Sequence, residues 1–212
     1  YDKMSTLIRQ ALEQIEEIKN KEDGLSGIPS GFADLDRVTS GWQKSDLVIL
    51  AARPGMGKTA FVLSMARNTA VQFNKPVAVF SLEMSSVQLV NRLISSESGI
   101  PAEKLRKGNL EDHEWIQLNQ QITSLSEAPL FIDDTPALTV FELRAKCRRL
   151  VRNNGVEMVI IDYLQLMHAG NSNKSGNREQ EISTISRSLK SIAKELNIPI
   201  IALSQLSRAV ET

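Results

Sequence analysis

Hydrophobic and polar residues follow one another in blocks along this chain, and each block has the length of a single strand or helix. Five apolar runs are typical of strands buried on both faces, namely residues 46–52, 76–82, 129–133, 156–162 and 198–204. Helical periodicity is predicted over residues 58–73, 85–98, 101–126, 139–152 and 178–196. Strands that alternate with helices predict an α/β fold, with a mostly parallel twisted sheet and helices on both faces.

An amphipathic helix is predicted at residues 5–19, ahead of these blocks. Its apolar residues fall on one helical face, and a segment with three glycines and a proline follows at 21–31. We therefore divide the chain into a linker helix with its linker, residues 1–24, and a main domain, residues 25–212. A helix set apart in this way cannot bury its own apolar face, so either its own domain or another subunit must cover it.

Composition and charge limit the classes of protein to consider. The chain has 212 residues, 42% of them hydrophobic and 24% charged, which is an ordinary globular balance. The 25 basic and 25 acidic residues cancel, so contact with a nucleic acid would have to be local. No apolar run has the length of a membrane span or a signal peptide. Cys147 is the single cysteine, and we expect it to be a core or groove residue and not a reactive thiol. We expect a cytoplasmic protein with no membrane partner.

The segment ARPGMGKT at residues 52–59 has the spacing of a Walker A phosphate loop, between a predicted strand and a predicted helix. Its glycines permit turns that bring backbone amides onto a phosphate. Lys58 can reach the β and γ oxygens, and the Thr59 hydroxyl can ligate Mg²⁺. Ala52 replaces the usual first glycine, and a glycine-rich connector is the competing interpretation. The expected nucleotide-binding residues are Arg53, Pro54, Gly55, Met56, Gly57, Lys58, Thr59 and Ala60.

Acidic and amide side chains follow the ends of other predicted strands. Asp162 closes the most apolar run, so it is our Walker B candidate, holding Mg²⁺ through water, whereas Asp133 and Asp134 suit a turn or a helix cap. Glu83 follows the second strand and could orient a water molecule, or could simply favour the start of a helix. Gln205 follows the fifth strand and could contact a γ-phosphate, or could be a solvated glutamine.

Several longer motifs resemble one family. In chain order they are RPGMGKTA, FSLEMS, VIIDYLQLM, NREQEISTISRSLKSIAKEL and IPIIALSQLSRAVE. Together they closely resemble the RecA-like motor domain of the bacterial replicative DNA helicases, the DnaB family. The resemblance covers about residues 25–212, and it includes SGIPSGFADLDRVTSGW, which is similar to the segment that leads into that domain. Agreement of several long motifs in order is far more specific than a phosphate loop alone.

The resemblance implies a RecA-like P-loop NTPase core that uses ATP or another NTP with Mg²⁺. It implies that Lys58 and Thr59 bind phosphate and metal, and that Glu83 is the catalytic glutamate. It also makes Asp162 the Walker B aspartate and Gln205 the switch glutamine. The family forms homohexameric rings that hydrolyse NTP at subunit interfaces and move 5′ to 3′ on single-stranded DNA at the replication fork. The helix at 5–19 then resembles the linker helix that docks onto the adjacent subunit.

The resemblance also implies parts that lie outside the chain. An arginine finger and a lysine supplied in trans belong to a later part of the domain, and most of a second DNA loop begins near Arg208. The collar domain that meets primase belongs upstream of Tyr1, and a helicase loader is a further partner of the full-length protein. Both chain ends therefore look like cuts in a longer protein. We expect weak or no ATPase activity, and no unwinding, from this chain alone.

A polar loop at residues 168–177 is the predicted DNA contact, with Lys174 inside it and Arg178 just beyond. These residues and Arg208 suit phosphate contacts and not base reading, because the loop has no aromatic residue. A plain mobile surface loop is the alternative. The basic cluster at 144–152 favours a solvated or interface face over the DNA path. A RecA-like recombination or assembly module that binds ATP without unwinding, and a remnant without hydrolysis, are the competing functions.

Overall fold

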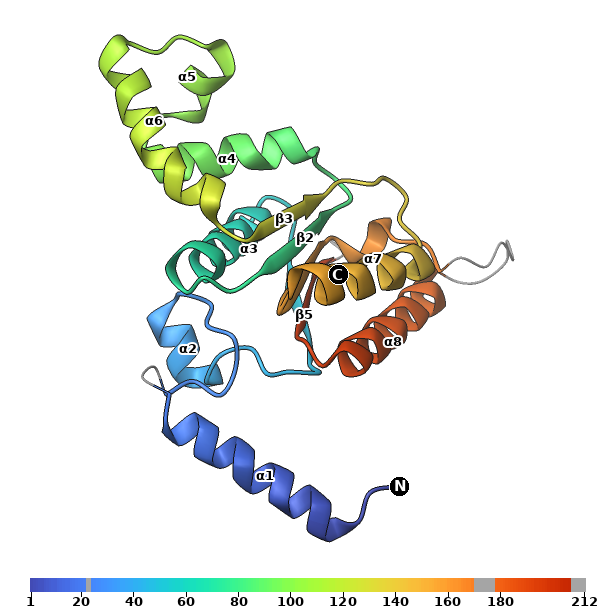
Figure 1. Ribbon diagram of the computed structural model, residues 1–212. Coiled ribbons are helices and arrows are strands. Elements are labelled where there is room, and N and C mark those ends of the chain that lie inside the picture. Colours follow the sequence, from blue (N-terminus) through green and yellow to red (C-terminus); the bar gives the residue numbers. More distant parts are fainter. Residues whose placement is uncertain (22–23, 170–177, 207–212) are drawn as a thin grey trace.

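The structure, a computed structural model, describes residues 1–21, 24–169 and 178–206. Within these residues it contains a five-stranded parallel sheet in the order β1-β5-β4-β2-β3 (Figure 1). The strands are β1 (Leu47–Ala52), β2 (Val77–Ser81), β3 (Leu130–Asp133), β4 (Met158–Asp162) and β5 (Ile200–Gln205). Each lies within one of the five predicted apolar runs or exceeds it by one residue, and the predicted α/β class is confirmed.

The α-helices are α1 (Met4–Lys19), α2 (Ala33–Thr39), α3 (Lys58–Arg67), α4 (Ser86–Ser98), α5 (Ala102–Lys107), α6 (Asp112–Glu127), α7 (Val140–Asn154) and α8 (Arg178–Leu196). A π-helical stretch, Asn68–Gln72, extends α3, and a 3₁₀ turn, Leu164–Leu166, follows β4. The helix α2 and the 3₁₀ turn were not predicted, because elements of seven and three residues are too short to show a helical period. Both α4 and α7 begin with a capping box, whose N-terminal residues are Ser85 and Thr139.

Helices cover both faces of the sheet, with α7 and α8 on one face and α3 and α4 on the other (Figure 1). The side chains of β4 alternate between the two cores: Val159 and Ile161 face α7 and α8, and Met158 and Ile160 face the opposite layer. All five residues of β2 and of β4 are buried. Burial on both faces explains why these strands are continuously apolar and do not alternate with polar residues.

The segment before β1 is fixed by one buried carboxylate. Asp36 of α2 is 8% exposed, and its Oδ1 accepts hydrogen bonds from the backbone N–H and hydroxyl of Ser30, at 2.8 and 2.7 Å. Its Oδ2 accepts from the N–H of Gly31 at 3.1 Å. Nearby, Ile28 pairs with Trp42 in an antiparallel bridge. A side chain outside the phosphate loop therefore holds the turn that leads into the sheet.

Replacing Asp36 with alanine is expected to lower the free energy of unfolding by about 2–4 kcal/mol, because three donors lose a charged acceptor in a buried turn. Asp34 on the same helix is a matched control, since its side chain is 91% exposed and pairs with Arg37 at the surface. Asp34→Ala should change stability by less than about 0.5 kcal/mol. Urea denaturation of both variants measures the difference, and equal effects would contradict the assigned role.

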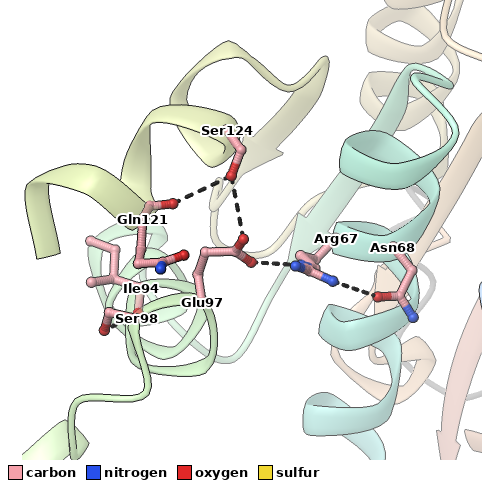
Figure 2. Close-up of polar contacts among 7 residues, drawn as sticks. All are labelled: Arg67, Asn68, Ile94, Glu97, Ser98, Gln121 and Ser124. Atoms are coloured by element: carbon pink, nitrogen blue, oxygen red, sulfur yellow. Dashed lines mark hydrogen bonds and ion pairs between the residues drawn. The ribbon is translucent and has the colours of Figure 1, made fainter. Parts of the chain in front are cut away.

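The helices α4, α5 and α6 form an excursion between β2 and β3, and an ion pair ties it to α3 (Figure 2). The Nε of Arg67 on α3 donates to Oε2 of Glu97 on α4 at 2.6 Å, and Ser124 of α6 donates to Oε1 of Glu97 at 3.3 Å. Glu97 is 8% exposed in its side chain. The hydrogen bond from Arg67 lowers the pKa of the Glu97 carboxyl, against the opposing effect of burial.

Replacing Glu97 with glutamine is expected to cost about 1–2 kcal/mol of stability at neutral pH, because a partly shielded charge-assisted hydrogen bond weakens. The Glu97 pKa is lower in the folded state, so its contribution is present above the unfolded-state pKa of about 4.3 and is lost as pH falls through the lowered value. Denaturation at pH 7 and pH 3, beside Glu127→Gln as an exposed control, measures this. The stability difference between Glu97→Gln and the parent should be smaller at pH 3 than at pH 7, and a difference that is as large or larger at pH 3 would contradict the prediction.

The helix α1 lies apart from the layers around the sheet (Figure 1). The structure describes α1 in full, and no residue of it is buried. Its apolar stripe is exposed, with Ile8 at 53%, Leu12 at 59% and Ile15 at 61%. The described part of the main domain therefore leaves this stripe exposed.

Candidate active site

The carboxyl ends of four parallel strands meet at one edge of the sheet, and the strand register brings the predicted residues there. Asp162, the last residue of β4, pairs with Ser81 at the end of β2, and Gln205 of β5 pairs with Ala52 of β1. Glu83 follows two residues after Ser81. In a parallel α/β sheet this edge is where ligands bind.

The phosphate loop joins β1 to α3. Gly55 and Gly57 have φ values of +77° and +82°, a conformation that side chains other than glycine rarely adopt. A Cβ at either position would meet nothing within 4 Å, so the backbone torsion, and not crowding within the protein, requires glycine here. Ala52 is the last residue of β1 and has no positive φ, which explains why alanine is accepted at the first position of the motif.

The two expected metal-binding residues are in direct contact. The Thr59 hydroxyl donates to Oδ2 of Asp162 at 2.8 Å, across 103 positions of sequence. Asp162 is 3% exposed. Burial raises the pKa of its carboxyl, the hydrogen bond from Thr59 acts in the opposite direction, and the charge of Glu83 adds to the rise. A hydroxyl and a carboxylate at this place are the hard oxygen donors that Mg²⁺ prefers.

Lys58 and Glu83 lie close enough to this pair for both charges to act on the carboxyl of Asp162. The Lys58 ammonium donates to the carbonyl of Ala52 at 2.8 Å and to that of Arg53 at 3.2 Å, so it lies across the loop. The turn that carries Glu83 is fixed by the buried Ser81, whose hydroxyl donates to the carbonyl of Met84 at 2.8 Å. The Glu83 side chain itself is exposed, so a fixed turn presents an accessible carboxylate.

A cavity of about 710 Å³ contains these groups. It includes all four residues expected to be catalytic, which are Lys58, Glu83, Asp162 and Gln205. Its other lining residues are Pro54, Gly55, Gly57, Thr59, Ala60, Met84, Gln88, Arg92 and Tyr163. Arg53 and Met56 were expected in the nucleotide site but do not line this cavity; Arg53 contributes its carbonyl to Lys58.

Arg92 is a residue of the cavity that was not predicted. It lies inside α4, four positions after Gln88, and the two share one face of that helix and both line the cavity. The positive charge of Arg92 lowers the pKa of the Asp162 carboxyl, against the dominant effect of burial. No local pattern indicates such a residue, because its position depends on how α4 packs on the sheet.

Gln165 was not predicted either, and it fixes the end of β5. Its side-chain amide donates to the hydroxyl of Ser204 at 2.9 Å and to the carbonyl of Gln205 at 3.1 Å, and its Oε1 accepts from the N–H of Gln205 at 3.2 Å. The motif VIIDYLQLM contains this glutamine, but nothing in its local pattern indicates a contact with a strand 40 residues later. Gln205 is thereby held at the rim by its backbone, and its side chain remains available to the cavity.

The residues assigned to structural roles lie where the patterns placed them. Asp134 accepts from the N–H of Ser86 at 2.7 Å, which lowers the pKa of its carboxyl, so it caps the start of α4. Asp133 accepts from the N–H of Thr135 at 3.0 Å, which is a turn contact, and it also pairs with Lys146 of the basic cluster. Cys147 is fully buried, and burial raises the pKa of its thiol to about 12, so it is a core residue and not a reactive thiol.

Of the three residues expected to bind DNA, the structure describes Arg178. Lys174 and Arg208 lie outside the described residues. Arg178 begins α8, where its guanidinium contacts the carboxylate of Glu181 and the carbonyl of Gln165. This places Arg178 beside the residue that holds the rim of the cavity, and its contact with DNA stays a prediction.

A comparison with protein families decides the relationship. The family described as the DnaB-like helicase C terminal domain matches residues 27–212. The chain belongs to this family. The sequence resemblance to DnaB helicases is thus confirmed, and the RecA-like core fold is confirmed by the solved structures that share it.

The relatives are similar over the whole chain. It is 50% identical over 211 residues to the replicative DNA helicase DnaB of Geobacillus stearothermophilus and 49% identical to the replicative DNA helicase DnaC of Bacillus subtilis. Each match covers 100% of this chain but 46% of the relative, so the chain spans about half the length of these relatives.

Two solved structures share its fold. One, described as an ATPase domain, has a TM-score of 0.88 at 40% identity, over 99% of this chain and 74% of that one. A DnaB-like replicative helicase, described with its interactions with primase, has a TM-score of 0.85 at 39% identity, over 95% of this chain and 49% of that one.

In the part of the chain that the structure describes, none of the helices could span a membrane.

Proposed function

We propose that this chain is the NTP-driven motor domain of a replicative DNA helicase. It would hydrolyse ATP at the subunit interfaces of a hexameric ring, which moves 5′ to 3′ on single-stranded DNA and unwinds the duplex. The observation that carries the proposal is the cavity that gathers Lys58, Thr59, Glu83, Asp162 and Gln205 in a member of the DnaB-like family.

The residues of the cavity fit a triphosphate with Mg²⁺. Gly55 and Gly57 give the loop its two positive φ values, and backbone N–H groups of the loop together with the Lys58 ammonium would bind the phosphates. Thr59 and Asp162 would hold the metal, Asp162 through water. Bound Mg²⁺ would neutralise charge that develops on the phosphates during transfer.

The remaining residues supply the chemistry. Glu83 would orient the attacking water and accept its proton, because its carboxylate is exposed to the cavity on a fixed turn. Gln205 would contact the γ-phosphate side of the nucleotide, since it lines the cavity from the end of β5. The arginine finger and lysine from an adjacent subunit, which the family resemblance implies, would complete the site.

The exposed stripe of α1 supports the assembly part of the proposal. The described residues of the chain leave its apolar side chains exposed, so a neighbouring subunit would cover them, as the resemblance to a linker helix implies. Single-stranded DNA would meet Lys174, Arg178 and Arg208 through its phosphates. Primase, with which one structural relative is described, and a helicase loader would be partners of the full-length protein, in the cytoplasm.

Strand displacement by the full-length protein tests the proposal. On a forked duplex with a labelled strand, ATP and Mg²⁺ should produce single strands. A fork whose long tail is the 5′ tail should be unwound in preference to a fork whose long tail is the 3′ tail. An ATP-dependent recombination or assembly module would bind ATP and form oligomers with no displacement on either fork, and that result would reject the motor.

A further inference from the structure

Gln165 joins the end of β5 to the turn after β4 with all the polar atoms of its side chain. Its amide nitrogen donates to the hydroxyl of Ser204 and to the carbonyl of Gln205, and its Oε1 accepts from the N–H of Gln205. The 3₁₀ turn that carries Gln165 starts two residues after Asp162. The end of the strand with the expected switch glutamine is therefore attached to the turn that follows the expected metal-binding aspartate.

The backbone of Gln165 meets a third segment, the first turn of α8. The guanidinium of Arg178 donates to the carbonyl of Gln165 and, at 3.4 Å, to that of Met167. Glu181, one turn further along α8, binds the same guanidinium through Oε2 and accepts from the N–H of Ala169 through Oε1 at 3.4 Å. The start of α8 is thus tied to the chain after β4 by contacts that include Gln165.

Gln165 consequently lies between the proposed nucleotide site and Arg178, a residue expected to bind DNA. Its side chain holds Gln205, whose own side chain forms no hydrogen bond among the residues that the structure describes and lines the cavity. Its carbonyl is bound by Arg178, which is expected to meet DNA phosphates. Gln165 itself does not line the cavity, so contact with a nucleotide does not account for its position.

We propose that Gln165 is a positioning residue that couples the nucleotide site to the start of α8. This rests on the proposed function. A shift of Gln205 toward or away from a γ-phosphate would displace the end of β5, and the three hydrogen bonds of Gln165 would transmit that displacement to the turn and to Arg178. The affinity for single-stranded DNA would then depend on which nucleotide is bound, as reciprocal coupling between two sites requires.

The coupling is measured as a ratio of DNA affinities. The full-length protein is titrated into a labelled oligothymidylate, once with the non-hydrolysable triphosphate AMPPNP and once with ADP, both with Mg²⁺. The unsubstituted protein should bind the oligonucleotide with clearly different affinities in the two states. In Gln165→Ala that difference should shrink by about 5-fold or more, which is the size expected when an intermediate residue of a coupled network is removed.

Two further variants separate coupling from a general loss of structure. Gln165→Met has a side chain of similar length without hydrogen-bonding atoms, so it should melt near the parent temperature and still lose the coupling. Gln120→Ala, at an exposed glutamine of α6, is the matched control and should keep the ratio of the unsubstituted protein. Thermal melting checks that each variant is folded.

Three results would overturn the proposal. The first is a ratio of DNA affinities with AMPPNP and ADP that is unchanged in Gln165→Met. The second is an equal loss of DNA affinity with both nucleotides in Gln165→Ala, which a purely structural role would give. The third is an unsubstituted protein that binds both nucleotides but has the same DNA affinity with each, because there is then no coupling to carry. Failure of the unsubstituted protein to bind either nucleotide would instead reject the proposed function itself.

Discussion

Replacing Glu83 with glutamine in the full-length protein is expected to lower ATP turnover by at least ~10²-fold while nucleotide binding is retained. Glutamine keeps the shape of the side chain but cannot accept a proton from water. The turn should be unchanged, because the hydroxyl of Ser81 and the capping box at Ser85 hold it without the carboxylate. The charge of Glu83 raises the pKa of Asp162, so its removal favours the ionised form of the metal-binding carboxyl.

Steady-state hydrolysis and ATP titration of the same Glu83→Gln preparation distinguish a loss of turnover from a loss of nucleotide binding. Glu127→Gln is the matched control, since Glu127 is an exposed glutamate at the end of α6 and lies outside the cavity. Its turnover should equal that of the unsubstituted protein. Near-normal turnover in Glu83→Gln would transfer the water-orienting role to another carboxylate, and a parallel loss of ATP binding would assign Glu83 to the binding of the ligand.

Most of the sheet could be predicted because its strands are apolar runs, and the central strands β2 and β4 are buried on both faces. The run at 156–162 is apolar until Asp162, and the observed strand is fully buried with that aspartate at its end. The helix α2 could not be predicted, because it is short and its place depends on Asp36 accepting three hydrogen bonds from the residues before it. A network of this kind leaves no periodic pattern in the sequence.

The residues of the candidate site also fall into two groups, those that a local sequence pattern could predict and those that depend on tertiary packing. The residues that could be selected lie at a strand end or in a loop motif, and parallel strands bring such ends together; they are Lys58, Thr59, Glu83, Asp162 and Gln205. Arg92 and Gln165 could not be selected, because their positions depend on how α4 packs on the sheet and how the turn after β4 meets β5. The functional meaning of a residue inside a helix depends on the face it presents, which tertiary packing decides.

Replacing Lys58 with alanine in the full-length protein is expected to weaken both ATP and ADP by roughly 30–100-fold. The ammonium would contact oxygens of the β- and γ-phosphates, and loss of one or two charge-assisted hydrogen bonds has an effect of this size. The fold should not suffer, because the ammonium contacts two loop carbonyls, of Ala52 and Arg53, that water can reach after the substitution. Lys194→Ala, an exposed lysine of α8, is the control.

The pattern across nucleotides is what identifies the role of Lys58. A cation that reaches the β-phosphate supports ATP and ADP alike, whereas a group that meets only the third phosphate would leave ADP binding unchanged. Calorimetric titration of both nucleotides against Lys58→Ala, under one set of conditions, therefore shows where the ammonium lies along the phosphate chain. Unchanged binding of both would show that the glycine-rich turn is only a connector between β1 and α3, and the proposed motor would lose its nucleotide site.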